Sequence, residues 1–156
     1  MKTNLRSLSL ILLVPLVLSP AASLRAATTD RNLTDEQAIT QLEQRAQQAS
    51  PRDQCFLYTE LVSAMTELAG RQMLDGDTDH ASAMLKKIEH YAELIHVGLG
   101  GDPKRIKNAQ LLMHRTAYRL SEYIHQASTE DQATLQATLK QLNQVQDELL
   151  TQVFKK

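Results

Sequence analysis

Cysteine, glycine and catalytic signature motifs are scarce in this sequence, and each shortage excludes a class of site. The chain has one cysteine, Cys55, so it forms no internal disulfide and has no Cys-x-x-Cys-His motif for covalent haem attachment. Its five glycines are scattered and mostly fall in turns, so no glycine-rich loop is present to bind phosphate. No Gly-x-Ser-x-Gly motif marks a nucleophilic serine. We therefore expect neither an enzyme nor a bound cofactor.

The one long apolar run lies near the N-terminus. It follows the basic residues Lys2 and Arg6, extends over Leu8–Leu18 and gives way to small residues, which is the order of a secretory signal peptide. The run is shorter than the roughly twenty residues that cross a bilayer as a helix. We predict a signal peptide over residues 1–26, with cleavage after Ser23 or Ala26, so that the mature protein begins between Leu24 and Thr28. The protein is then exported to the periplasm or the extracellular space, without stable membrane insertion.

The net charge bears on the partners that the exported chain can bind. Residues 1–27 contain three basic side chains, Lys2, Arg6 and Arg25, and no acidic one, so the remainder has 14 Lys and Arg against 18 Asp and Glu, a formal charge of −4. A mildly acidic chain without basic clusters lacks the electrostatic footprint of a nucleic-acid-binding protein. We predict no nucleic acid as partner, and instead another protein or a second copy of this chain.

Beyond the leader, apolar residues recur at spacings of three and four, which predicts helices and no strands. A short amphipathic helix is expected at about Leu33–Ser50, with Thr34 as its cap. Longer helices are expected at Arg52–Leu74 and Asp79–Leu99, from Pro103 onward, and after Ser128 or Thr129. Short turns join these helices, and the predicted fold is all-α: residues 27–50 form a tail and the short helix, and residues 51–156 form an antiparallel four-helix bundle. Six positions on the inner faces should tolerate truncation poorly: Leu61, Met65, Ile88, Ile95, Leu120 and Leu142.

The second of these helices carries a feature that a simple bundle does not explain. Phe56, Ser63 and Gly70 recur every seven residues, on a face well away from the main apolar stripe. We consider two interpretations, namely that the first helix covers this face or that a partner chain docks there. Cys55 opens the same helix beside its apolar stripe, so burial as a small hydrophobic residue is favoured over an exposed thiol.

Two Glu-x-x-His spacings resemble half of a di-iron site, in which such pairs come from two helices of a bundle. They are Glu93 with His96 and Glu122 with His125. Both glutamates fall on the outward side of their helices, and the two motifs lie near opposite ends of an antiparallel hairpin. A metal site is therefore not expected. "DGDTDH", from Asp75, resembles the start of a calcium-binding loop, but the glycine and glutamate that such a loop requires at its sixth and twelfth positions are absent.

Three stretches resemble one uncharacterised family of small exported all-helical bacterial proteins: "PRDQCFLYTELVSAMTELAG", "KNAQLLMHRTAYRL" and "TLKQLNQVQDELLTQVFKK". The resemblance covers about residues 51–156 and implies no activity. A shorter stretch, "LTDEQ" at Leu33–Gln37, is similar to the Leu-Thr-x-x-Gln motif of the Spy/CpxP periplasmic chaperones. Those proteins carry the motif twice and have a basic concave surface, whereas this chain has it once. The leading hypothesis is a non-catalytic protein-interaction module, and the alternative is a chaperone of the Spy/CpxP kind.

Overall fold

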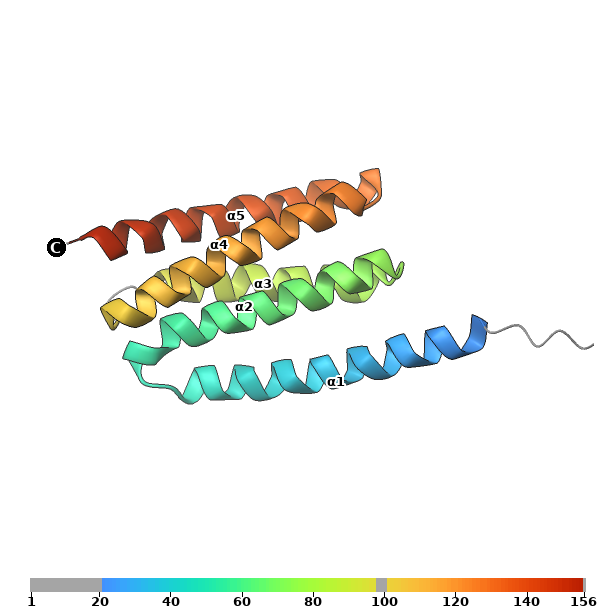
Figure 1. Ribbon diagram of the computed structural model, residues 1–156, viewed down its shortest axis with the longest axis horizontal. Helices are drawn as coiled ribbons and strands as arrows, with labels where there is room; N and C mark the ends of the chain where they lie inside the picture. Colours follow the sequence, from blue (N-terminus) through green and yellow to red (C-terminus); the bar gives the residue numbers. More distant parts are fainter. Residues whose placement is uncertain (1–20, 98–100, 156) are drawn as a thin grey trace, which may run out of the picture.

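The computed structural model describes residues 21–97 and 101–155, and this part of the chain is all-helical (Figure 1). No strand occurs in the described ranges. The predicted signal peptide falls mostly on residues 1–20, which lie outside them. The helices are α1 (Ala21–Gln48), α2 (Pro51–Leu74), α3 (Thr78–Val97), α4 (Pro103–Gln126) and α5 (Thr129–Phe154).

Local sequence signals account for most of the helix boundaries. Proline is the first residue of α2 and α4, where its missing N–H costs nothing. Before α4, the Asp102 carboxylate accepts hydrogen bonds from the backbone N–H groups of Arg105 and Lys104, which lower the pKa of Asp102. Ser128 caps α5 by accepting from the N–H of Asp131, so the prediction of a cap at this position is confirmed.

The first helix is much longer than predicted. It begins at Ala21 rather than near Leu33, so Thr34 lies inside α1 and does not start it. The sequence between Ala21 and Asn32 contains several alanines and no glycine or proline, so nothing in it opposes a helix. The correction is that residues 27–32, expected to be a tail, are helical, and the same helix includes residues 21–26, the end of the predicted signal peptide.

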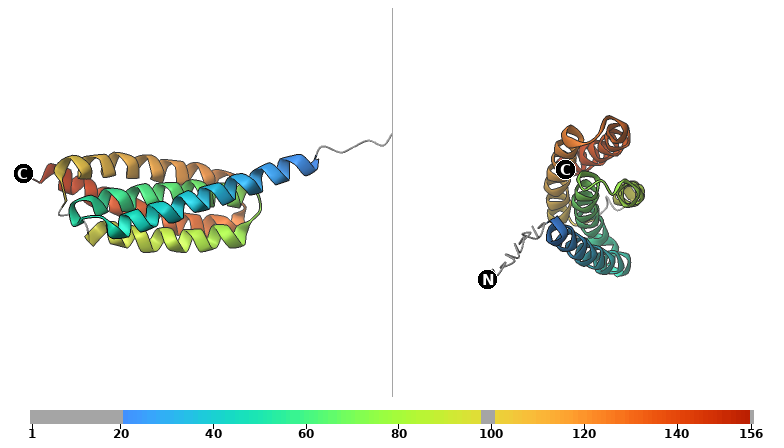
Figure 2. Two further views of the ribbon diagram at one scale, coloured as in Figure 1. Left: turned by 90° about the horizontal axis from the view of Figure 1, so that it is seen from below. Right: turned by 90° about the vertical axis from the view of Figure 1, so that its right-hand side faces the viewer.

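α2 lies at the centre of the molecule, with α1, α3 and α4 packed around it (Figure 2). α5 completes the arrangement by packing against α4 and α3. Consecutive helices run antiparallel, as predicted, but α2 and α4 lie side by side and run in the same direction (Figure 1). α2 therefore has buried residues on most of its circumference, from Cys55 to Met73.

The core confirms the helical phase expected from the sequence. All six residues predicted to face inward have no exposed surface: Leu61, Met65, Ile88, Ile95, Leu120 and Leu142. Cys55 is also buried, as predicted, and burial raises the pKa of its thiol to about 11.

α1 is attached to the other helices largely through polar contacts. Among its described side chains, only Ile39 and Ala46 are buried hydrophobic residues. Asp35 forms an ion pair with Arg71 of α2, and Arg45 forms another with Glu60 at 3.2 Å. Glu36 accepts a hydrogen bond from Gln72 and Glu43 accepts one from Tyr91. The acidic residues of the "LTDEQ" stretch thus hold α1 against α2.

Candidate functional site

α4 differs from the rest of the chain in charge. It contains five Lys and Arg side chains and one Glu, a formal charge of +4, whereas the whole chain has a net charge of −1. The other residues together therefore carry −5. Five of the 17 Lys and Arg side chains lie on this one helix, which a net charge summed over the whole chain does not reveal.

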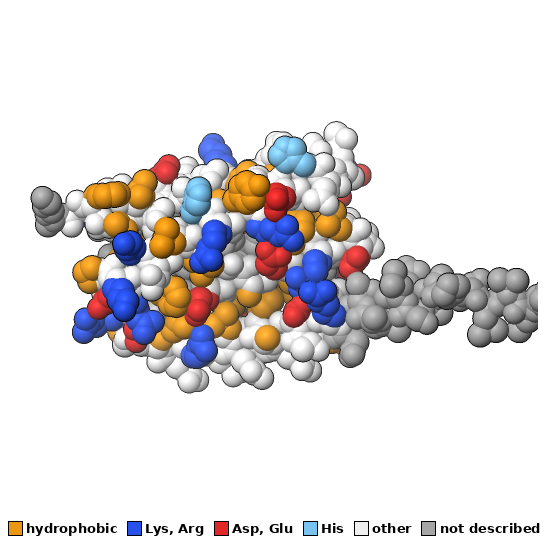
Figure 3. Space-filling view, viewed as in Figure 1, with side chains coloured by type: hydrophobic (Ala, Val, Ile, Leu, Met, Phe, Trp, Pro, Cys, Tyr) orange, Lys and Arg blue, Asp and Glu red, His pale blue; other side chains and the backbone are white. Residues whose placement is uncertain are grey.

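One side of α4 combines these cations with exposed hydrophobic side chains. We define the outer face of α4 as Lys104, Lys107, Leu111, Arg115 and Tyr118, all exposed and within one quarter of the helix circumference. Leu111 is 49% exposed and Tyr118 is 65% exposed. Figure 3 shows Lys and Arg side chains beside hydrophobic ones along the course of α4. This surface was not identified from the sequence.

Exposed hydrophobic residues are concentrated in this part of the molecule. Among the residues whose side chains the structure describes, six large hydrophobic ones are exposed, and four of them belong to α4 and α5. The two on α5 are Leu150 and Phe154, near its C-terminal end. Scattered single residues of this kind are ordinary, but several on one hairpin are typical of an interaction surface.

The edge of α4 that faces α2 carries a compact polar cluster. Tyr123 donates a hydrogen bond to the Glu67 carboxylate at 2.7 Å, and Arg119 donates to the same carboxylate at 3.1 Å. Arg119 also donates to Glu122 at 2.8 Å, and its guanidinium lies 4.8 Å from the centre of the Tyr123 ring. Burial, and next the Glu67 carboxylate, raise the pKa of Tyr123. The pKa of Arg119 is raised by Glu122 and then by Glu67.

The stripe of Phe56, Ser63 and Gly70 is directed toward α4. Gly70 is buried, and a Cβ atom added to it would overlap the ring of Tyr123. Phe56 is half-buried, with the Arg105 guanidinium 5.9 Å from its ring centre, and Ser63 is also half-buried. The interpretation of Gly70 as part of a partner face is therefore corrected, because α4 fills the space above it.

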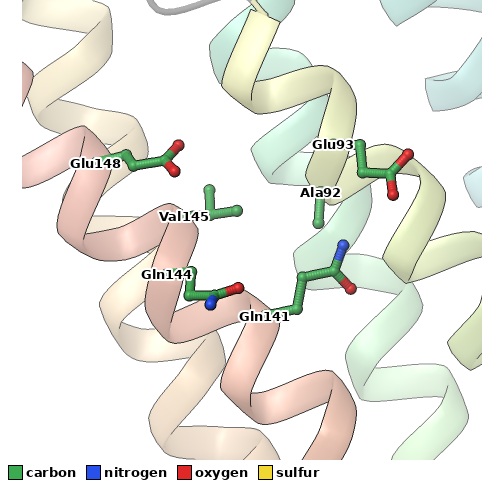
Figure 4. A pocket seen from close by; sticks show the side chains of 6 residues that line it. All are labelled: Ala92, Glu93, Gln141, Gln144, Val145 and Glu148. Atoms are coloured by element: carbon green, nitrogen blue, oxygen red, sulfur yellow. The ribbon is translucent and has the colours of Figure 1, made fainter.

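A different concavity lies between α3 and α5 (Figure 4). Val145 and Glu148 project from α5 toward α3, and Ala92 faces them from α3. The space measures about 230 Å³, which is smaller than a typical small-molecule pocket of roughly 300–1,000 Å³. We call it the α3–α5 groove, and its lining residues are Ala92, Glu93, Gln141, Gln144, Val145 and Glu148.

The floor and the rim of the α3–α5 groove differ in chemistry. Ala92 and Val145 are buried and apolar, whereas Glu93 is an exposed carboxylate at the edge. Below this level, Gln141 of α5 donates a hydrogen bond to the Glu89 carbonyl of α3 at 3.0 Å. That bond joins the two helices beside the groove.

The two Glu-x-x-His spacings are not brought together. Glu93 lies on α3 and Glu122 on α4, two helices without mutual contact in the described ranges. The Glu122 carboxylate is bound by Arg119, and the His125 ring nitrogen Nδ1 lies 2.6 Å from the Ser121 carbonyl. Among the residues that the structure describes, no three potential ligand side chains are grouped to hold a metal ion.

Of the aspartates of "DGDTDH", Asp75 and Asp77 lie in the turn between α2 and α3, and Asp79 lies in the first turn of α3. Asp75 follows the last residue of α2, and its N–H donates to the Arg71 carbonyl. Gly76 has a φ of 80°, a left-handed conformation that a side chain disfavours. The Asp77 carboxylate contacts the His80 ring at 2.7 Å, which raises the pKa of His80.

No known protein-family model matches this chain, and searches of curated proteins and of solved structures give no match. Within the described residues, no helix has the length and apolar character needed to cross a membrane. The geometry of the two surfaces on α4 and between α3 and α5 is therefore the basis for a functional proposal.

Proposed function

We propose that this protein is an exported, non-catalytic protein-interaction module. In this proposal α2–α5 form a four-helix bundle, α1 is an accessory helix, and the outer face of α4 is the binding surface. The observation that carries the proposal is the exposure of Leu111 and Tyr118 between Lys104, Lys107 and Arg115. Tyrosine and arginine, here Tyr118 and Arg115, are among the side chains that supply most of the binding energy at protein interfaces.

The packing of the helices supports the bundle. Each of α2, α3, α4 and α5 packs against two of the other three, so the four helices form a closed ring of neighbours. Leu61, Met65, Leu120 and Leu142 fill the space inside it without exposure to solvent. A core occupied by the protein's own side chains favours binding on the outer surface over binding of a ligand inside the bundle.

The chemistry of the outer face supports a binding role more than a structural one. Leu111 and Tyr118 stand seven residues apart, about 10 Å along the helix, and both are exposed to water. Lys104 and Lys107 have no ion-pair partner among the described residues, whereas Arg105 and Arg119, at the edge of α4 beside α2, are paired with Asp53 and Glu67. These two arginines join α2 to α4, and the cations of the outer face remain available to another molecule.

Site-specific photo-cross-linking tests the proposal. A photoreactive phenylalanine analogue is placed at position 118 in the native cell, and in a matched control at position 33, where Leu33 of α1 is 54% exposed. We expect cross-linked protein from position 118 that is absent from position 33, and its loss when Leu111 is also replaced by Asp. Equal cross-linking from both positions, or none from position 118, would contradict a binding surface on α4.

A further inference from the structure

The outer face of α4 and the α3–α5 groove are complementary in shape and charge. The first has two exposed hydrophobic side chains with cations beside them, and the second has an apolar floor lined around it by two glutamines and two glutamates. We propose that the partner bound by α4 is a second copy of this chain, with the outer face of α4 of one protomer seated in the α3–α5 groove of the next. The inference rests on the proposed function and names the partner.

Tyr118 is the side chain on α4 best suited to enter the groove. It is 65% exposed, the largest exposed fraction among the large hydrophobic residues of α4. The groove, at about 230 Å³, has room for a single large side chain, and its floor of Ala92 and Val145 is apolar. A tyrosine buries a large apolar ring in such a hollow while its hydroxyl stays at the polar rim. Gln141 and Gln144, which line the groove, offer amide groups to that hydroxyl.

Charge decides which surfaces can pair. Two α4 outer faces would bring Lys104, Lys107 and Arg115 of each copy together, and like charges in an interface oppose association. The groove instead carries Glu93, which is exposed at its edge. Arg115 stands one turn from Tyr118, so a seated Tyr118 places this cation near the rim. The complementary charges therefore favour α4 against the groove over α4 against itself.

The two surfaces belong to different parts of the molecule. Figure 2 shows α3 and α4 on opposite sides of α2, and these two helices make no mutual contact in the described ranges. One protomer can therefore use both surfaces at once. An interface between two different surfaces produces a closed ring or an open chain rather than a two-fold dimer. The expected assembly is head-to-tail.

Sedimentation velocity over a series of concentrations tests the association directly. We expect the purified protein to form larger species as its concentration rises, and the Tyr118→Ala variant to raise the apparent dissociation constant at least about tenfold. Leu33→Ala, which removes an exposed hydrophobic residue from α1, is the matched control and should leave association unchanged. A wild-type protein that stays monomeric throughout overturns the inference.

Charge reversal identifies the two sides of the interface. Arg115→Glu and Glu93→Lys should each abolish self-association, whereas Asp147→Lys, an exposed position elsewhere on α5, should not. An equimolar mixture of the first two variants should associate again, because the acidic α4 of one variant meets the basic groove of the other, and the unchanged α4 and groove can also pair. Failure of this mixture to associate, with each variant folded by circular dichroism, overturns the assigned pairing.

The outcomes separate this inference from the proposed function. If position 118 cross-links to a different protein while the purified chain stays monomeric, the inference fails and the interaction module stands. A basic face could also bind an anionic lipid surface. Flotation with vesicles of phosphatidylglycerol and phosphatidylcholine tests for this. Binding to these vesicles that depends on Tyr118 and Lys107, without self-association, would overturn both the inference and the protein partner.

Discussion

The ring of Tyr123 in α4 lies directly against the Cα atom of Gly70 in α2. A Cβ atom at position 70 would lie less than 3.0 Å from atoms of this ring. Real Cβ atoms do not come so close to a neighbour, so the ring would have to move. Tyr123 is only 3% exposed, and its hydroxyl is held by Glu67, so the ring has little freedom to shift. Glycine therefore sets the distance at which the two helices pack.

Replacing Gly70 by alanine tests this contact. We expect Gly70→Ala to lower the free energy of unfolding by about 1–3 kcal/mol, because the added methyl group overpacks the α2–α4 interface. Ser63→Ala, on the same stripe and half-buried, is the control and should change it little. Urea denaturation measures both. In a Tyr123→Leu background the cost of Gly70→Ala should shrink, and an unchanged cost would mean that the ring is not the obstacle.

Ile95 and Glu93 are two positions apart on α3, and replacing each by alanine should have very different effects on stability. Ile95 is fully buried, so Ile95→Ala is expected to cost about 2–5 kcal/mol in stability through lost burial and a cavity. Glu93 is exposed, so Glu93→Ala should cost about 0.5 kcal/mol or less. Thermal or urea denaturation gives both values, and the reverse order would mean that the helical phase of α3 is wrong.

Tyr91 links stability to alkaline pH. Burial, and next the Glu43 carboxylate, raise the pKa of Tyr91 to about 12, above the value of about 10 in an unfolded chain. A group whose pKa is raised by folding stabilises the folded state at any pH below its pKa in the unfolded chain. This contribution disappears as the pH rises through the folded-state pKa of about 12. We expect Tyr91→Phe to reduce the loss of stability in this range. A pH series of urea denaturation on both proteins measures it, and parallel curves would exclude Tyr91 as the group responsible.

Cys55 should be chemically inert in the folded protein. It is 1% exposed and its thiol has a pKa of about 11, so very little reactive thiolate is present at neutral pH. A thiol reagent is expected to modify Cys55 only in denaturant, at a rate that follows unfolding. Rapid labelling of the native protein would show that the thiol is accessible.

The sequence predicts the helices from α2 onward and their inward faces, because apolar spacing reports directly which side of a helix is buried. Leu61 and Leu142 are examples, both assigned from this spacing and both fully buried. The start of α1 was missed because its alanine-rich beginning has no strong apolar stripe. Gly70 was misread because α2 is surrounded by three helices, and the periodicity of one helix does not identify its neighbours.

The outer face of α4 was missed for a different reason. A net charge summed over the chain hides the +4 of α4 beneath the acidic residues of the other helices. Leu111 and Tyr118 lie opposite the inward face that the sequence predicts for this helix, but single exposed hydrophobic residues are ordinary and do not by themselves indicate a binding surface. Gln141 and Ala92, in the α3–α5 groove, are far apart in sequence, and only the packing of α3 against α5 brings them together.

The central position of α2 also determines how the molecule opens. Because α1, α3 and α4 enclose it, the amide hydrogens in the middle of α2 reach water only when the surrounding helices separate. α1 is held by Ile39, Ala46 and a few polar contacts, so it can detach while the rest stays intact. Amide exchange in α2 therefore reports the stability of the whole molecule, whereas exchange in α1 reports a local opening that breaks the hydrogen bond between Tyr91 and Glu43.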